Sequence, residues 1–238
     1  MIFVQDLMKG LTMKYSNILK GVFVSRPNRF IAIVSIGGRD EICHVKNTGR
    51  LGEILASGCT VYVQKCSNPS RKTQYDLIAA EHDGQIINID SQAPNKVIHE
   101  WLKKGGYFKN ISLIKPECRY KNSRFDFYVE ADGRKTFIEV KGVTLKNGDT
   151  ALFPDAPTER GVKHLYELCD CIGNGYDACV IFLAKMKGVR CFSPNSSTHP
   201  EFAKALKNAE NNGVRIICMD CNVTCNSLEP DSFIEIKL

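Results

Sequence analysis

The strongest constraint on the fold is a change of pattern near residues 91–94, which divides the sequence into two unlike parts. Before this point, short runs of β-branched and aromatic residues alternate with turn residues, which is typical of antiparallel strands. After it, helical and strand-like patterns alternate, as in α/β folds. The 238 residues are enough for two domains. We therefore predict an α/β (α+β) protein with domains at residues 1–90 and 91–238.

The first part predicts six strands, near residues 18–25, 29–36, 40–45, 60–65, 74–81 and 85–89. Between the third and fourth strands, Thr48 can cap a helix whose apolar face is formed by Leu51, Ile54 and Leu55. A small sheet with a short helix in this position suits an OB-fold, although other small barrels share the strand count. We expect an OB-fold-like β-barrel at residues 1–90.

The second part begins with a helix near residues 94–104, because Pro94 suits a first helical turn and Gly105 ends the helical pattern. Its apolar side chains recur at helical spacing: Val97, Ile98, Trp101 and Leu102. Three strands follow, near residues 111–119, 124–130 and 135–143. The Asp132-Gly133 pair predicts a tight hairpin between the second and third of these strands.

The rest of the second part predicts alternating helices and strands. A helix capped by Thr158 extends to about residue 172 and carries an apolar stripe. Beyond it the pattern predicts a buried strand, a helix and a strand, at residues 178–184, 200–211 and 214–219. A helix, a three-stranded meander and a second helix therefore form the centre of a mixed α/β domain.

Composition excludes several classes of protein. With 43% hydrophobic and 24% charged residues, the chain matches soluble globular proteins and not disordered, collagenous or coiled-coil ones. No apolar run approaches the roughly 20 residues of a membrane helix, and residues 1–10 do not resemble a signal peptide. The eleven cysteines are therefore interpreted as reduced thiols of a cytoplasmic protein. A net charge of +6 favours a polyanionic partner.

Three ionisable residues on adjacent predicted strands are the best candidates for chemistry. Glu139 and Lys141 alternate on one face of a strand, and the predicted hairpin returns that strand beside the one carrying Asp126. Apolar residues occupy the intervening positions, so a register that buries them on one face directs all three polar groups to the other. Two carboxylates and a lysine can then converge.

This arrangement suits metal-dependent hydrolysis of phosphodiester bonds. Oxygen ligands from Asp126 and Glu139 would hold Mg²⁺ or Mn²⁺, and Glu117 on the preceding strand is a candidate third carboxylate. Lys141 would position water or stabilise developing charge. An acid pair and a lysine also occur on the solvated face of an ordinary amphipathic sheet, so the spacing alone is a weak signal. The surrounding helix, meander and helix resemble the PD-(D/E)xK nuclease superfamily.

Several longer strings resemble the sugar fermentation stimulation protein A family. These are SRFDF, FIEVKGVTL and FPDAPTERGVKHL in the second part, with HVKNTG, NPSRKT and APNKVIHEWL before them. The resemblance spans nearly the whole chain. It implies an N-terminal OB-fold, a nuclease-like α/β domain, DNA binding without sequence specificity and, for one member, regulation of maltose metabolism. Gly142 departs from the family, which often has Asn after EVK.

Basic residues near the second helix of this domain can contact a phosphate. Arg160, Lys163 and His164 share one face at the positive N-terminal end of that helix. An ordinary surface pair between Glu159 and Lys163, with His164 satisfied within the helix, is the alternative. With the neighbouring acids and the family resemblance, we assign Lys163 and His164 to the catalytic site and Arg160 to DNA binding.

The predicted barrel carries a second set of basic residues, Arg26, Arg29, Arg71 and Lys72. Small barrels bind nucleic acid through grooves of cations and stacking rings. Short basic clusters are usually only solubilising, but the resemblance favours phosphate contact here. No helix suited to reading bases is evident, so sequence specificity is not expected. The cysteines near residues 218–225 are interpreted as structural, because half of them lie on an apolar strand.

Two functional hypotheses follow. In the first, the protein is a Mg²⁺-dependent DNA endonuclease whose barrel holds the DNA backbone. In the second, it is a DNA-binding regulator of sugar metabolism that has the nuclease fold without turnover. An enzyme acting on sugar finds no support in the motifs. A dimer is compatible with the sequence, which leaves the oligomeric state open.

Overall fold

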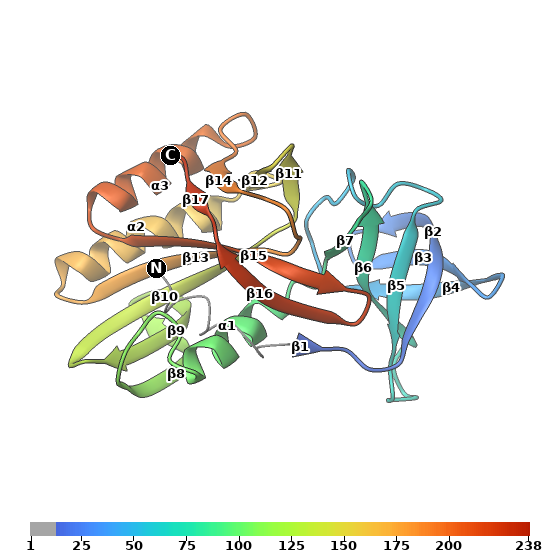
Figure 1. Cartoon of the computed structure of the whole chain (residues 1–238), viewed down its shortest axis with the longest axis horizontal. Helices are drawn as coiled ribbons and strands as arrows, with labels where there is room; N and C mark the ends of the chain where they lie inside the picture. Colours follow the sequence, from blue (N-terminus) through green and yellow to red (C-terminus); the bar gives the residue numbers. More distant parts are fainter. Residues whose placement is uncertain (1–12) are drawn as a thin grey trace.

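The computed structural model describes residues 13–238, in which a β-barrel lies beside an α/β domain (Figure 1). The expectation that residues 1–10 contain no export signal lies outside the described residues. All six strands predicted before residue 90 are present. They are β2 (Ile18–Asn28), β3 (Ile31–Ile36), β4 (Arg39–Val45), β5 (Thr60–Lys65), β6 (Tyr75–His82) and β7 (Gln85–Asn88).

The first sheet closes on itself as a barrel. Its strand order is β4-β3-β2-β5-β6-β7, and β4 also pairs with β6, so that five strands form a closed ring. Gly37 and Gly38 both have positive φ, which the two-residue turn between β3 and β4 requires. Alternate residues of the strands fill the interior, as the period-two pattern predicted, for example Ala32, Val34 and Cys43.

The helix predicted at Thr48–Leu55 is wrong. This segment forms turns, and Leu51 has a φ of 52°, which an α-helix excludes. Arg26 gives a physical reason, because its guanidinium donates hydrogen bonds to the carbonyls of Gly49 and Arg50, at 2.9 and 2.7 Å. Those are carbonyls that a helix beginning here would use for its own backbone bonds. The apolar side chains are still buried.

The second domain contains a seven-stranded sheet in the order β1-β16-β15-β13-β10-β9-β8. The strands are β1 (Met13–Lys14), β8 (Ile111–Tyr120), β9 (Ser123–Ala131), β10 (Arg134–Val143), β13 (Asp177–Ala184), β15 (Arg215–Thr224) and β16 (Ser227–Phe233). The predicted meander is β8-β9-β10, and β13 pairs in parallel with both β10 and β15. Asp132 and Gly133 have positive φ at the hairpin, as predicted.

Helices cover both faces of this sheet (Figure 1). They are α1 (Ala93–Lys103), α2 (Glu159–Gly173) and α3 (Pro200–Asn211). The apolar residues of α1 pack against Ile138 and Val140, whereas those of α2 and α3 pack in the cluster that contains Phe137 and Phe182. On β10, Glu139 and Lys141 therefore lie on the face opposite Ile138 and Val140, as the alternation predicted, and α2 covers that face.

A four-stranded sheet that the pattern did not predict lies next to α3 (Figure 1). Its strands are β11 (Leu145–Asn147), β12 (Thr150–Phe153), β14 (Cys191–Pro194) and β17 (Glu235–Ile236). Each strand is two to four residues long, too short for a periodic pattern to emerge.

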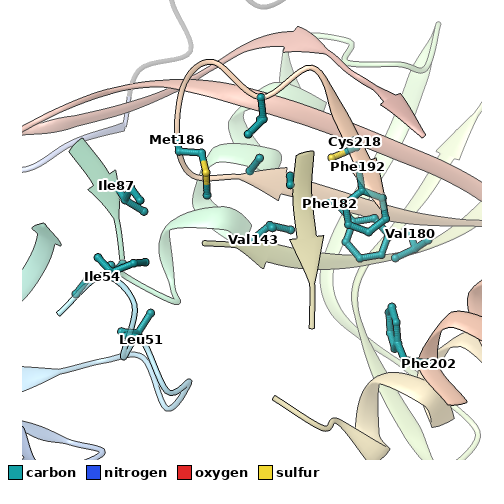
Figure 2. Packing of buried hydrophobic residues seen from close by; sticks show 14 of the residues in the cluster. Leu51, Ile54, Ile87, Val143, Val180, Phe182, Met186, Phe192, Phe202 and Cys218 are labelled. Atoms are coloured by element: carbon teal, nitrogen blue, oxygen red, sulfur yellow. The ribbon is translucent and has the colours of Figure 1, made fainter. Parts of the chain in front are cut away.

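One hydrophobic cluster joins the barrel to the α/β domain. Figure 2 shows Leu51, Ile54 and Ile87 of the barrel on one side of it and Val143 and Met186 of the α/β domain on the other. All five side chains are buried. The two domains therefore share part of their core. No helix within residues 13–238 is long and apolar enough to cross a membrane.

Candidate active site

Asp126 and Glu139 occupy neighbouring positions on β9 and β10. The antiparallel register pairs Phe127 with Ile138, so Asp126 on β9 lies across from Glu139 on β10. The backbone N–H of Val140 donates to Asp126 Oδ2 at 2.7 Å. From α1, Asn95 Nδ2 donates to Asp126 Oδ1, also at 2.7 Å. The Asp126 carboxylate is thereby held between the sheet and the start of α1.

Glu139 is the buried centre of the site. Its side chain is only 6% exposed, and Oε1 accepts from Lys141 Nζ and from His164 Nδ1, each at 2.6 Å. The other oxygen, Oε2, is buried and has no hydrogen-bond partner among the described residues. An unsatisfied buried carboxylate oxygen is unfavourable, so it identifies a position where a further donor or a cation would be stabilised.

His164 orients Glu139 from α2. The N–H at Arg160 Nε donates to His164 Nε2 at 3.3 Å, so that ring nitrogen is the acceptor. The proton of the neutral imidazole then lies on Nδ1 and is donated to Glu139. The sequence placed Arg160 and His164 on one face of a helix, and the structure shows that this face meets the acids.

The two carboxyl groups have pKa values shifted in opposite directions. Burial, followed by the charge of Glu139, raises the pKa of Asp126. Burial also opposes ionisation of Glu139, but the hydrogen bond from His164 and the charge of Lys141 outweigh it and lower the pKa of that carboxyl group. The site therefore favours an ionised Glu139, and a cation beside Asp126 would relieve the cost of ionising it.

Glu117 and Lys163 are not brought to this site. Glu117 has a positive φ of 52°, its side chain is 67% exposed, and it pairs with Arg124 at 3.3 Å. The expected third carboxylate is thus directed to solvent. Lys163 pairs with Glu167 at 3.7 Å along α2 and is also largely exposed. Within residues 13–238, no group of three or more His, Cys, Asp or Glu side chains is arranged to hold a metal ion.

Two of the four basic residues assigned to the barrel have structural partners. Arg26 organises the 47–50 loop through its carbonyl bonds. Arg71 pairs with Asp76 at 2.6 Å and also donates to Cys66 Sγ. Both guanidinium groups are therefore engaged in contacts within the barrel, which makes them less available to a ligand than the sequence implied.

The other two basic residues of the barrel, Arg29 and Lys72, are exposed. The guanidinium of Arg29 lies over the exposed ring of Phe30, 4.9 Å from its centroid. A cation next to an accessible aromatic ring is a combination that single-stranded nucleic acid can use.

Sequence reasoning missed Asn95. It lies in the first turn of α1, which the helical pattern predicted, but its contact with Asp126 spans 31 residues of sequence. The only signal was its place in the string APNKVIHEWL. Because Asn95 fixes Asp126, it belongs to the site with His164.

The fold defines a two-domain protein with an N-terminal OB barrel and a C-terminal α/β domain. Residues 24–89 match the family model of the SfsA N-terminal OB domain, and residues 92–227 match that of the sugar fermentation stimulation protein RE domain. The chain belongs to the sugar fermentation stimulation protein A family.

Curated relatives agree with this assignment. Sugar fermentation stimulation protein homologs from Clostridium beijerinckii and Ruminiclostridium cellulolyticum are 57% and 55% identical to this chain. Each alignment covers 95% of this chain and 100% of the relative. Among solved structures, Pyrococcus furiosus SfsA in complex with Ca²⁺ is similar, with a TM-score of 0.87 and 29% identity, covering 95% of this chain and 98% of that one.

Proposed function

We propose that this protein is a divalent-metal-dependent nuclease that hydrolyses phosphodiester bonds in DNA, with Asp126, Glu139 and Lys141 as its site. The observation that supports this most directly is the buried Oε2 of Glu139, which has no hydrogen-bond partner within residues 13–238 and lies next to a second carboxylate whose ionisation is disfavoured. A cation bound between these groups would resolve both features.

The residues fit a hard divalent cation such as Mg²⁺ or Mn²⁺. Mg²⁺ is usually held by one or two carboxylates, with water and substrate phosphate at the remaining positions. Asp126 and Glu139 supply such a pair. The similar P. furiosus protein has been solved with Ca²⁺, which also prefers oxygen ligands. When bound, the metal would acidify the attacking water and offset phosphate charge.

The protein's own side chains keep the site in a single arrangement. Asn95 and the Val140 N–H orient Asp126, while His164 holds Glu139 ionised. Lys141 lies next to Glu139 and is partly exposed, so its ammonium can donate to a phosphate oxygen or to the attacking water.

DNA is the proposed substrate because exposed cations lie on both domains. Arg29 and Lys72 of the barrel and Arg160 at the start of α2 are exposed, and the chain has a net charge of +6. Cations of this kind contact the phosphate backbone, which carries no sequence information, so binding without sequence specificity is expected.

The proposal is tested by incubating supercoiled and single-stranded DNA with purified protein in Mg²⁺, Mn²⁺ or EDTA. Wild-type protein should cut only with metal, and Asp126→Asn and Lys141→Met should bind DNA without cutting it. Lys163→Met is the matched control, since this exposed lysine pairs with Glu167 and should leave cutting unchanged. Cutting by Asp126→Asn at the wild-type rate would contradict the proposal.

A DNA-binding regulator without turnover is the second candidate. It is favoured by the orientation of Glu117, which leaves two carboxylates at the site. In that case wild-type protein and both variants would bind DNA alike, and no metal would produce cutting of any substrate.

A further inference from the structure

A cleft of about 320 Å³ lies between the two domains, outside the group of acids. The barrel contributes Asn47 and Thr48, and the α/β domain contributes Ser91, Gly142, Thr158 and Lys185. This volume lies at the lower end of the range for small-molecule sites, and domain boundaries are a common location for such sites.

The cleft also has a position in the sheet that favours ligand binding. β10 and β13 are parallel, and both end beside it, at Val143 and Ala184. Open α/β sheets bind ligands beyond the carboxyl ends of parallel strands. Gly142, which lines the cleft, directly follows Lys141 of the acidic site, so the two sites are adjacent along β10.

Lys185 is a buried cation in this cleft. The residue is 1% exposed, and Nζ donates one hydrogen bond, to the backbone carbonyl of Asp90 at 3.1 Å. Across residues 13–238, no carboxylate oxygen forms an ion pair with Nζ, although the negative charges of Asp90 and Asp155 act on it from further away. Burial lowers the pKa of Lys185 to about 8. An ammonium has three N–H donors, so a ligand in the cleft can accept from those that Asp90 does not use.

Further donors lie at the opposite wall, where α2 begins. Thr158 Oγ1 accepts from the Gly161 N–H at 3.0 Å, which leaves its hydroxyl proton available to a ligand. α2 has 15 residues, and its N-terminal end carries partial positive charge. An anion between Lys185 and Thr158 would therefore be stabilised from both sides.

We propose that this cleft binds a backbone phosphate of a DNA strand. The phosphodiester bond that is cut would be the next one along the same strand, and it would lie at Asp126 and Glu139. This substrate assignment rests on the proposed nuclease function. Phosphate binding by the cleft does not require cutting. Asp155 also lines the cleft, and its carboxylate weakens the binding of an anion, which provides a variant of opposite sign.

The test is isothermal titration calorimetry in EDTA, where no metal-dependent cutting takes place. The probes are inorganic phosphate, a thymidine dinucleotide with a 5′-phosphate, and deoxythymidine monophosphate. Lys185→Met should bind them about 10- to 100-fold more weakly than wild-type protein, because it removes a charge-assisted hydrogen bond. Asp155→Asn should bind them more tightly.

Gly142→Ala should also weaken phosphate binding, and this variant retains Lys185. A Cβ at residue 142 would lie 2.8 Å from Pro94 Cγ and 3.2 Å from Lys185 Cε, so both neighbours must shift and phosphate binding should weaken. Because these titrations contain EDTA, they measure phosphate binding in the absence of cutting, which separates this inference from the nuclease proposal. Circular dichroism confirms that each variant is folded.

Tighter binding of the dinucleotide than of the free nucleotide or inorganic phosphate would support a strand phosphate as the occupant. A preference for inorganic phosphate or the mononucleotide would overturn the strand assignment. Equal affinity of wild-type protein and folded Lys185→Met, or no binding by wild-type protein, would overturn the proposed site.

Discussion

Glu139 is buried yet kept ionised, and His164 is the side chain that contributes most to this. Its Nδ1–H donates to the Glu139 carboxylate at 2.6 Å, while Arg160 fixes the tautomer from the other side of the ring. Because the pKa of Glu139 is lowered in the folded protein, the stabilising charge is present above the ordinary pKa of Glu and is lost as the pH falls through the folded value.

Replacement of His164 by Leu removes the donor and should raise the pKa of Glu139. Since a metal needs the ionised carboxylate, the pH midpoint of Ca²⁺ or Mg²⁺ binding should move up by about one to two pH units. Calorimetric titrations from about pH 3 to 8 measure this midpoint, because the lowered pKa of Glu139 places the wild-type value in the acidic part of that range. His164→Asn is the control, because its amide N–H can replace Nδ1–H and should keep the midpoint near that of the wild type. If His164→Leu leaves the pH midpoint of metal binding unchanged, His164 does not keep Glu139 ionised.

Asp126→Asn tests whether ionised Asp126 destabilises the folded protein when no metal is bound. The pKa of Asp126 is raised, so the folded state binds more protons than the unfolded state just above the ordinary pKa, and stability falls as the pH rises through that window. At pH 7 in EDTA, Asp126→Asn should therefore melt higher, by about 2–4 °C for roughly 1 kcal/mol. The amide of Asn95 can rotate to keep its hydrogen bond.

Bound metal should reverse the order of the two melting temperatures, so that wild-type protein melts above Asp126→Asn. Added Ca²⁺ should raise the melting temperature of wild-type protein and have little effect on Asp126→Asn, because one of the two proposed ligands is neutral in the variant. A lower melting temperature of the variant in EDTA would show that ionised Asp126 stabilises the fold.

At the scale of elements, α2 supplies the side chains that orient Glu139, namely His164 and, through it, Arg160. His164 reaches Glu139, and Arg160 reaches His164, only if the helix begins at the correct residue. Thr158 marks that beginning by accepting the Gly161 N–H. The side chain of this N-cap therefore contributes to stability and to the position of His164.

Thr158→Ala should lower the free energy of unfolding by about 1 kcal/mol, since it leaves the first-turn N–H unsatisfied. Thr158→Ser keeps the hydroxyl and should lose less. Urea unfolding followed by circular dichroism measures both. If the Ala and Ser variants are equally stable, the hydroxyl does not contribute to the helix.

At the scale of the whole molecule, the barrel and the α/β domain share one hydrophobic cluster (Figure 2). Hydrogen bonds add to this link, because the backbone N–H of Asn88 in the barrel donates to the Lys185 carbonyl at 3.0 Å, and Lys185 Nζ donates to the Asp90 carbonyl at 3.1 Å. Neither domain can lose its fold without exposing part of the other's core. We therefore expect the described parts of both domains to unfold together.

Met186→Ala tests this coupling. Met186 is fully buried at the junction, so its truncation should lower the free energy of unfolding by about 2–5 kcal/mol and shift one common transition. Differential scanning calorimetry distinguishes one transition from two. Tyr166→Ala, at a half-exposed position on α2, is the control and should change stability by less than about 0.5 kcal/mol. Two separate transitions, with only one of them shifted, would contradict the shared core.

The sequence by itself determined the features that depend on near neighbours along the chain. Alternating side chains indicated the barrel strands and the meander, helical spacing indicated α1, α2 and α3, and Asp132-Gly133 indicated the hairpin that places Asp126 beside Glu139. The main acids of the site followed from this hairpin, because register is a local consequence of a two-residue turn.

Tertiary structure alone decided what depends on distant partners. Arg26 binds the carbonyls of Gly49 and Arg50 in the segment predicted as a helix, and Glu117 lies exposed beside Arg124 instead of joining the other acids. The contact of Asn95 with Asp126 and the cleft around Lys185 join segments that no local pattern connects. A sequence pattern records the faces of single elements, whereas hydrogen bonds and burial between elements depend on how the whole chain packs.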